Sequence, residues 1–219
     1  KDVIKMMLKL PGEEILAFKA GQYIEFIMED NSRRAFSLAN PPHEPLLELH
    51  LRLIEGGKFT EFVFTEMKEK SIHRIDAPIG QFYLRESEKP VLFVAGGTGF
   101  APIKSVIEDM IFNNIRRPVF LYRGSGSFDD LYMHDLANNW ANTIDEFTYI
   151  PVSEKVINNN DQLRAGLVHE AVLEDFKSLD NVQVYCCGAP GLVQVAFESF
   201  VNKGLPEDEF FADAFTFAP

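Results

Sequence analysis

The chain has 219 residues, 46% of them hydrophobic and 25% charged, a composition typical of a globular protein with one or two domains. Its net charge of −12 argues against nucleic acid and against an anionic membrane surface as partners. The two cysteines, Cys186 and Cys187, are adjacent, which excludes a disulfide framework and is too few for the four thiolates of an iron–sulfur cluster. We therefore expect no metal centre and a reducing, cytoplasmic location.

The first part of the chain, to about residue 90, has the alternating pattern of β-strands. The sequence opens on such a pattern without a visible targeting segment, so we expect that the numbering begins inside a longer gene product. Further strands are predicted at 23–29, 46–54 and 75–85, the last with a turn, and one short helix at 58–67. Short strands separated by Gly and Pro favour a small antiparallel β-barrel.

From Lys89 onward, apolar runs without alternation predict buried strands at 91–95, 119–122, 147–152 and 182–187. Helical patterns lie between or after them, at about 100–114, 129–140, 166–176 and 190–203, and the Asn-rich 158–161 is expected to be a loop. Strands that alternate with helices indicate a doubly wound α/β domain with a parallel sheet. With the boundary near 86–90, the predicted domains are 1–88 and 89–219.

A glycine turn, Gly96-Gly97-Thr98-Gly99, follows the first strand of the predicted sheet and precedes a helix. The N-terminus of a helix at this place is a favourable site for a phosphate. The pattern departs from GxGxxG, and Arg123 stands where a dinucleotide-binding domain would carry an acidic residue. The alternative is that these glycines only form a tight turn.

Five further segments change this balance: "RRAFSLAN" (33–40), "HLRLIEGGKFT" (50–60), "GQFYLR" (80–85), "VYCCGAPGLV" (184–193) and "FFADAF" (210–215). With "AGGTGFAP", in this order and at these spacings, they resemble the ferredoxin–NADP reductase-like flavoprotein family, over essentially the whole chain. The resemblance implies that the barrel binds FAD and that the α/β domain binds a nicotinamide nucleotide.

The resemblance also implies an FAD site on the barrel. Arg34 matches the arginine with which the family contacts the FAD phosphate. Phe36 matches the aromatic residue that lies against the isoalloxazine, and Ser37 matches the residue whose hydroxyl lies near flavin N5. From the residues alone, Arg34 would be a solvated surface arginine, Phe36 a core residue and Ser37 an ordinary strand residue. The further FAD contacts implied are Ala35, Leu38, Ala39, Asn40, His50, Leu51, Arg52, Gly56, Gly57, Lys58, Phe59, Thr60 and Phe215. Here the alternative for His50 and Arg52 is an exposed polar strand face.

On the nucleotide side, the resemblance implies that Thr98 and Cys187 set the nicotinamide distance and that Ser37 tunes the flavin, which makes these three the catalytic candidates. Cys186 is expected to pack, and the alternative for Cys187 is likewise a buried apolar cysteine. The nucleotide contacts implied are Gly96, Gly97, Thr98, Gly99, Arg123, Cys187, Gly188, Pro190 and Asp213. Asp129 and Asp130 disfavour a 2′-phosphate, so we predict NADH over NADPH.

The predicted function is an FAD-dependent NAD(P)H oxidoreductase that passes electrons to an iron–sulfur centre, an oxygenase or another redox partner. Two alternatives stay open. One is a free-flavin reductase that uses FMN or FAD as substrate, and the other is a non-enzymatic FAD-binding subunit for electron transfer or regulation. A plain Rossmann dehydrogenase is less favoured, because it leaves the barrel and "RAFS" without a purpose.

Overall fold

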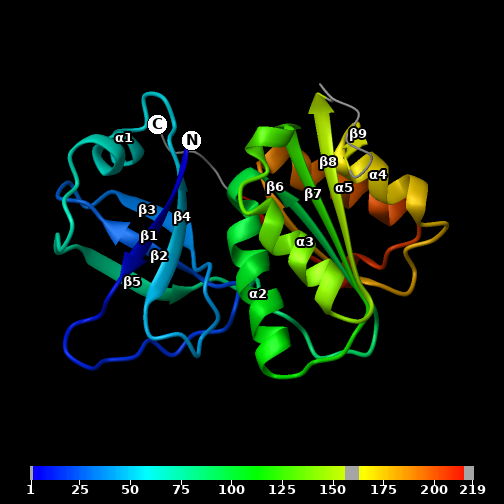
Figure 1. Cartoon of the computed structure of the whole chain (residues 1–219), viewed down its shortest axis with the longest axis horizontal. Helices are drawn as coiled ribbons and strands as arrows, with labels where there is room; N and C mark the ends of the chain where they lie inside the picture. Colours follow the sequence, from blue (N-terminus) through cyan, green and yellow to red (C-terminus); the bar gives the residue numbers. More distant parts are fainter. Residues whose placement is uncertain (1, 156–162, 215–219) are drawn as a thin grey trace. The chain divides into compact units, whose positions relative to one another are not determined.

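The computed structural model describes residues 2–155 and 163–214, and the chain folds into two compact units (Figure 1). The N-terminal unit takes in residues up to Leu84 together with Ala101–Asn114. The C-terminal unit takes in Arg85–Phe100 and the described residues from Ile115 onward. Most of the first helix after the glycine turn therefore clusters with the N-terminal strands.

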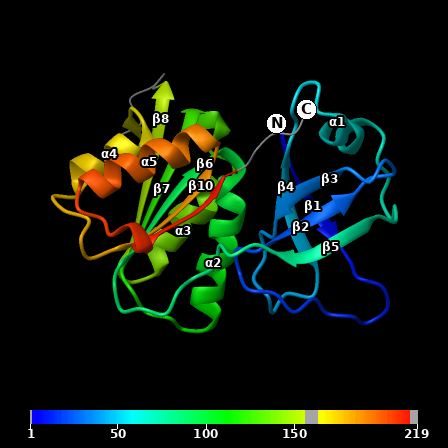
Figure 2. The same ribbon diagram turned by 180° about the vertical axis from the view of Figure 1, so that it is seen from behind.

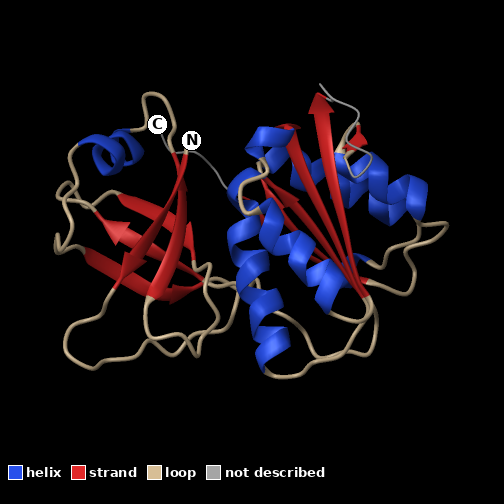
Figure 3. Ribbon diagram, viewed as in Figure 1, coloured by secondary structure: helices blue, strands red, loops and turns tan. Residues whose placement is uncertain are grey.

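The N-terminal unit is built from antiparallel strands and two helices, coloured by type in Figure 3. Strand β1 pairs with β4, β2 lies between β3 and β5, and the bridge Leu38–Leu49 links the two sheets. The expected antiparallel β domain is thus confirmed. Its elements are β1 (Val3–Leu8), β2 (Tyr23–Ile27), β3 (Arg33–Ser37), β4 (Leu47–Arg52), α1 (Lys58–Thr65), β5 (Arg74–Ile79) and α2 (Phe100–Phe112).

The core of this unit forms from the inward residues of the strands and of α1. Leu47, Leu49 and Leu51 of β4 are buried in it, as their spacing of two predicts. The other face of β4 is not exposed, because Glu48 and His50 are each only 5% exposed. The alternative of an exposed polar strand face therefore does not hold for His50. The burial of both side chains requires polar partners.

The C-terminal unit is a six-stranded, all-parallel sheet in the order β11-β10-β6-β7-β8-β9, which confirms the doubly wound α/β prediction. Figure 2 shows α4 and α5 on one face of this sheet, with α3 behind it. The elements are β6 (Val91–Gly96), η1 (Gly97–Gly99), β7 (Val119–Ser127), η2 (Phe128–Asp130), α3 (His134–Thr143), β8 (Phe147–Lys155), β9 (Arg164–Ala165), α4 (Val168–Asp175), β10 (Gln183–Gly188), α5 (Pro190–Asn202), η3 (Glu207–Glu209) and β11 (Phe210–Ala214).

Alternating residues of the parallel strands face α4 and α5 across a continuous core. Val94 and Cys186 contribute to it from the sheet, and Val172 and Phe200 from the helices. Cys186 therefore packs, as predicted. Cys187, the next residue, must point to the opposite face of β10.

Four local predictions differ from the structure. Strand β7 continues to Ser127 instead of ending near 122, and α3 begins at His134, since η2 occupies the start of the predicted 129–140 helix. No strand follows β5 in 80–85, and the two edge strands β9 and β11 were not predicted. The Asn-rich segment 158–161 and Phe215 lie outside the described residues.

Candidate functional site

Strand β3 carries the first candidate residues, and it ends in a buried hydroxyl. Ala35 is exposed, whereas Ser37 is 4% exposed and its Oγ has no hydrogen-bond partner among the described residues. An unpaired buried hydroxyl costs about 1–3 kcal/mol, so it signals a group prepared for a ligand or a strained position. This orphaned oxygen is the feature of the N-terminal unit that fits an FAD whose polar edge lies at Ser37.

The two arginines of β3 have different surroundings. Arg33 Nη1 lies 2.7 Å from both Glu25 Oε2 and Asp76 Oδ2, so its charge is already balanced on the outer face of the sheet. Arg34 is half-buried, and its guanidinium donates to the carbonyl of Arg33 at 2.9 Å. Arg33 is therefore engaged with carboxylates, and Arg34 is the residue that the sequence predicts as the FAD phosphate contact.

Phe36 and Phe59 are parts of one aromatic cluster. The ring centroid of Phe36 lies 5.9 Å from that of Phe26 and 5.4 Å from that of Phe59. Phe36 is only partly buried, so one side of its ring is left for a further contact. Phe59, by contrast, is 3% exposed and belongs to the core, which leaves its side chain no place in a phosphate grip.

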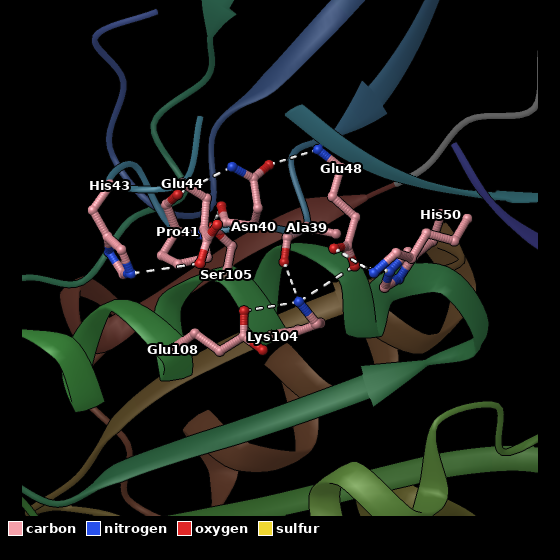
Figure 4. Close-up of polar contacts among 11 residues, drawn as sticks. Ala39, Asn40, Pro41, His43, Glu44, Glu48, His50, Lys104, Ser105 and Glu108 are labelled. Carbon is pink, nitrogen blue, oxygen red and sulfur yellow. Dashed lines mark hydrogen bonds and ion pairs between the residues drawn. The ribbon is translucent and has the colours of Figure 1, made fainter. Parts of the chain in front are cut away.

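The segment that follows Ser37 is held by hydrogen bonds from two elements (Figure 4). The backbone of Glu48 in β4 accepts from Ala39 N–H at 2.7 Å and donates to Asn40 Oδ1 at 2.7 Å. From α2, Lys104 Nζ donates to the carbonyl of Ala39 at 3.0 Å, and Ser105 Oγ to that of Asn40 at 2.6 Å. Leu38 and Ala39 are fully buried.

A buried charge cluster adjoins this segment (Figure 4). The Glu48 carboxylate lies 2.8 Å from His50 Nε2, 3.0 Å from Lys5 Nζ and 3.3 Å from Lys104 Nζ. Burial would raise the pKa of Glu48, but these three partners together lower it to about 2. Burial also lowers the pKa of His50 below its ordinary value, against the opposing hydrogen bond to Glu48, and Lys104 lowers it further.

The remaining residues of β4 lie close to this cluster. Leu51 is fully buried, and Arg52, at the end of the strand, is half-buried with its Nε 3.0 Å from Asp2 Oδ2. Glu48, Lys104 and Ser105 were missed as site residues. Charged and polar side chains inside the apolar run of α2 and on an inward strand face are the signal that would have indicated them.

The glycine loop before α1 satisfies most of its own polar groups. Gly56 N–H donates to the Glu61 carboxylate at 2.7 Å, and Thr60 Oγ1 is 3.0 Å from the carbonyl of Gly57, to which it donates. Lys58 is exposed at the first position of the helix. The first-turn amides of α1 are left outside its hydrogen-bond ladder, whereas the Thr60 hydroxyl stabilises the loop itself.

In the C-terminal unit, the GGTG turn packs directly against the end of β10. A Cβ at Gly99 would overlap the carbonyl of Cys187, and Gly97 has φ +54°, which favours glycine. Gly188, at φ +157°, lies so close to Gly96 that a Cβ would come within 3.3 Å of its backbone. Thr98 is half-buried between them.

A row of register partners crosses one face of the sheet: Asp213, Cys187, Ala95 and Arg123, from β11, β10, β6 and β7. Partners in parallel register project to the same face. Cys187 is fully buried, and burial raises the pKa of its thiol well above the ordinary value. Burial also raises the pKa of Asp213, whose Oδ2 is buried with no hydrogen-bond partner in 2–155 or 163–214.

Arg123 lies within β7 and not after it, because the strand is longer than predicted. It is 2% exposed, its guanidinium carbon lies 3.7 Å from the centroid of Phe100, and Nη2 donates to the carbonyl of Tyr132 at 2.8 Å. Its Nη1 is buried without a partner. Arg123 therefore does not provide a solvent-facing positive charge for a 2′-phosphate.

The carboxyl end of β7 carries the two acidic residues of the specificity prediction. Asp130 Oδ2 accepts from both the backbone N–H and the hydroxyl of Ser127, at 3.0 and 2.8 Å, and closes η2. Asp129 is exposed beside it. Pro190 is exposed at the first turn of α5, immediately after Gly188 and Ala189.

In the part of the chain that the structure describes, four residues with orphaned buried polar atoms coincide with sequence-predicted contacts: Ser37, Arg52 through its Nη2, Arg123 and Asp213. Each unit thus offers unpaired polar groups among residues that fit a flavin or a nicotinamide nucleotide. Among the described residues, no cluster of three His, Cys, Asp or Glu is placed to bind a metal ion. No helix in the described ranges is long and apolar enough to cross a membrane.

Comparisons with known proteins agree with both units. The oxidoreductase FAD-binding domain family matches residues 1–83, and the oxidoreductase NAD-binding domain family matches 93–198. The CDP-6-deoxy-L-threo-D-glycero-4-hexulose-3-dehydrase reductase of Yersinia pestis is 39% identical over 98% of this chain and 65% of that protein. The NAD(P)H-flavin reductase of Aliivibrio fischeri is 34% identical over 95% of this chain and 91% of that protein.

Among solved structures, the Amycolatopsis cytochrome P450 reductase GcoB superposes with a TM-score of 0.91 at 28% identity, over 98% of this chain and 66% of that one. Fold and motif order thus agree with an oxidoreductase FAD-binding domain followed by an oxidoreductase NAD-binding domain. The chain belongs to the ferredoxin–NADP reductase-like family of NAD(P)H-dependent flavoprotein reductases, with FAD- and NAD-binding domains. It spans 65% of the length of the Yersinia relative.

Proposed function

We propose that this chain is the flavin- and NADH-binding part of a reductase that supplies electrons to a separate redox centre. Residues 1–88 bind FAD and residues 89–219 bind the nicotinamide nucleotide. Bound FAD supplies the chemistry, since it accepts hydride at N5 and releases electrons singly or in pairs. The observation that carries the proposal is the unpaired Ser37 hydroxyl at the end of the R-A-F-S strand, beside a segment held rigid from two sides.

In this proposal the residues of the chain bind and orient the FAD and the nicotinamide nucleotide. Arg34 would hold the FAD diphosphate, the exposed part of Phe36 would contact the isoalloxazine, and the Ser37 hydroxyl would donate to the flavin edge. On the other unit, Thr98 and Cys187 set the position of the nicotinamide. The thiol of Cys187 stays protonated in this role, because burial raises its pKa. Positioning of this kind is the main protein contribution when the cofactor carries the chemistry.

The acceptor that we propose is an iron–sulfur centre, an oxygenase or another redox partner, on a separate protein or on a further domain. Two of the relatives are named as reductases of other enzymes, one of a deoxyhexulose dehydrase and one of a cytochrome P450. We also propose a reducing, cytoplasmic setting, which agrees with two buried free cysteines.

The test is the visible absorption spectrum of the purified protein, recorded before and after anaerobic addition of NADH. A flavin band that bleaches within the mixing time supports the proposal. A protein that neither carries nor takes up FAD, and does not oxidise NADH when FAD is added, contradicts it.

A second candidate is a free-flavin reductase, and one observation favours it. In the loop before α1, the Glu61 carboxylate accepts from Gly56, and the Thr60 hydroxyl bonds within the loop, so this part of the diphosphate grip is occupied by the chain itself. Gel filtration of the FAD-loaded protein separates the two. Flavin that elutes with the protein favours the bound cofactor, and flavin that elutes separately, with turnover dependent on added flavin, favours the second candidate.

A further inference from the structure

Lys104 is a buried ammonium group in an apolar stretch of α2. It is 4% exposed, and Nζ lies 3.0 Å from the carbonyl of Ala39, 2.8 Å from Glu108 Oε2 and 3.3 Å from Glu48 Oε1 (Figure 4). An ammonium group has three N–H donors, and each of these acceptors is within reach of one. This side chain is therefore fully engaged, and one of its bonds goes to a backbone carbonyl far away in the sequence.

Its neighbour Ser105 makes the matching contact to the next residue of the same segment. Ser105 is fully buried, and its Oγ donates to the carbonyl of Asn40 at 2.6 Å. Two successive side chains of α2 thus hold two successive carbonyls, of Ala39 and Asn40. Ala39 and Asn40 are both buried, so their carbonyls require polar partners, and these two side chains of α2 supply them.

The other side of this segment is bonded to the N-terminal strands. Leu38 N–H donates to the carbonyl of Gln22 at 2.9 Å, and Ala39 N–H to that of Glu48 at 2.7 Å. The segment 38–40 therefore has partners on both sides, and Ser37, which precedes it directly, is left with an unpaired hydroxyl. The unpaired hydroxyl of Ser37 therefore adjoins a segment whose backbone is held in place by hydrogen bonds.

We infer that Lys104 and Ser105 are positioning residues for FAD: through the carbonyls of Ala39 and Asn40 they hold the segment Ser37–Asn40 in its binding conformation before the flavin arrives. The inference rests on the proposed function, because that function assigns the segment to FAD. A segment that is already ordered binds its ligand more tightly, because binding then does not have to order it and lose that conformational entropy.

The inference has an electrostatic consequence at His50. This imidazole faces Glu48 on its own strand, and the ammonium groups of Lys5 in β1 and Lys104 in α2 act on it, while Glu108 balances Lys104 from the far side. Lys104 disfavours the protonated form of His50. Removing the Lys104 charge is therefore expected to raise the pKa of His50.

The experiment measures the FAD dissociation constant of the flavin-free protein by flavin fluorescence titration. Lys104→Met and Ser105→Ala are the test variants, and Lys5→Met is the matched control, because Lys5 contacts the same carboxylate but no carbonyl of the segment. We expect affinity to fall about ten- to a hundredfold in Lys104→Met and about three- to tenfold in Ser105→Ala. In Lys5→Met it should stay within about twofold of the wild type.

A second readout is an NMR titration of the imidazole of His50. Its midpoint should rise in Lys104→Met and stay unchanged in Ser105→Ala, although both variants bind FAD more weakly. A general loss of folding would not produce this split. Ser105→Ala also keeps the whole charge cluster, so it tests the inference if Lys104→Met fails to fold.

The outcomes separate the inference from the proposed function. Wild-type protein that does not bind FAD contradicts the proposed function. Wild-type protein that binds FAD, with an unchanged constant in Ser105→Ala or an equal loss in Lys5→Met and Lys104→Met, contradicts only the positioning role.

Discussion

Arg33 and Arg34 are neighbours on β3, but the first contacts two carboxylates and the second donates to the carbonyl of the first. Arg33 Nη1 lies 2.7 Å from Glu25 and from Asp76, whereas Arg34 bonds to the carbonyl of Arg33 at 2.9 Å. Neighbouring residues of a strand project to opposite faces, so these two guanidinium groups serve different purposes.

This pair supplies a matched test of the phosphate contact. Arg34→Ala should weaken FAD binding by at least about tenfold, because a charge-assisted contact to the diphosphate is lost. Arg33→Ala removes two surface ion pairs, each worth at most about 1 kcal/mol, and should leave FAD content unchanged. FAD content after gel filtration is the measurement, and a normal content in Arg34→Ala contradicts the assignment.

Ser37→Ala should separate stability from catalysis. The hydroxyl of Ser37 has no partner, so its removal should leave the melting temperature of the flavin-free protein unchanged or slightly higher. The rate of flavin reduction by NADH should fall by about tenfold or more, since the hydrogen bond to the flavin edge is lost. Stopped-flow absorption and thermal unfolding measure the two effects. A variant that loses stability but keeps its reduction rate would show that Ser37 has only a structural role.

Gly99→Ala should be strongly destabilising. The new Cβ would overlap the carbonyl of Cys187, and neither strand end can move without breaking the sheet, so we expect a loss of about 3 kcal/mol or more. Gly191→Ala is the control, because a Cβ there meets nothing within 4 Å. Urea unfolding of both variants checks the prediction. Equal midpoints would mean that the turn adapts to a side chain.

The choice of nucleotide should depend on Asp129. This carboxylate is exposed at the end of β7, where it would repel a 2′-phosphate, so the wild type should have a higher kcat/KM for NADH than for NADPH. Asp129→Ser should raise the NADPH:NADH ratio of kcat/KM about tenfold. Asp130 is less suitable for substitution, because it caps η2 through Ser127. A wild-type preference for NADPH would overturn the prediction.

Acid should destabilise the N-terminal unit in two stages. Below about pH 6.5, the ordinary value for histidine, the unfolded chain takes up a proton that buried His50 resists, so stability falls as the pH falls. Below about 4.5, the same holds for Glu48, whose pKa of about 2 keeps its carboxylate charged in the folded chain. His50→Gln should remove the upper stage. The measurement is the free energy of unfolding between pH 3 and pH 8. If its dependence on pH near pH 6 is the same in His50→Gln as in the wild type, the prediction is wrong.

The sequence predicted the fold well where periodicity dominates. Unbroken apolar runs identified the four central parallel strands, and helix signals identified α4 and α5 to within a few residues. The edge strands β9 and β11 were not predicted, because short edge strands have no periodic sequence pattern and form by pairing with a neighbouring strand. The continuation of β7 through Gly124 and Gly126 was not predicted either, because glycine in a sequence usually indicates a turn. At Gly124 tertiary packing requires glycine within the strand, since a Cβ there would overlap Val168.

The candidate site was predictable only in its motifs. Sequence spacing assigned Ser37, Arg123 and Asp213, but not which of their atoms would be left unpaired. The contacts of Lys104 and Ser105 join residues 65 positions apart, and only the fold brings them together. The burial of Arg123 was not predictable from its place in the sequence, because it depends on Phe100 and Tyr132, which cover it in space.

The assignment of Ala101–Asn114 to the N-terminal unit has a consequence for recombining such chains. A chimera joined at the linker near residue 88 would take α2 from the second parent and the carbonyls of Ala39 and Asn40 from the first. Glu48 would then depend on a foreign helix for its buried counter-ion. A crossover placed after Asn114 keeps Lys104 and Ser105 with the loop they hold, but it separates β6 from its sheet neighbours β7 and β10, so neither junction keeps both sets of contacts within one parent.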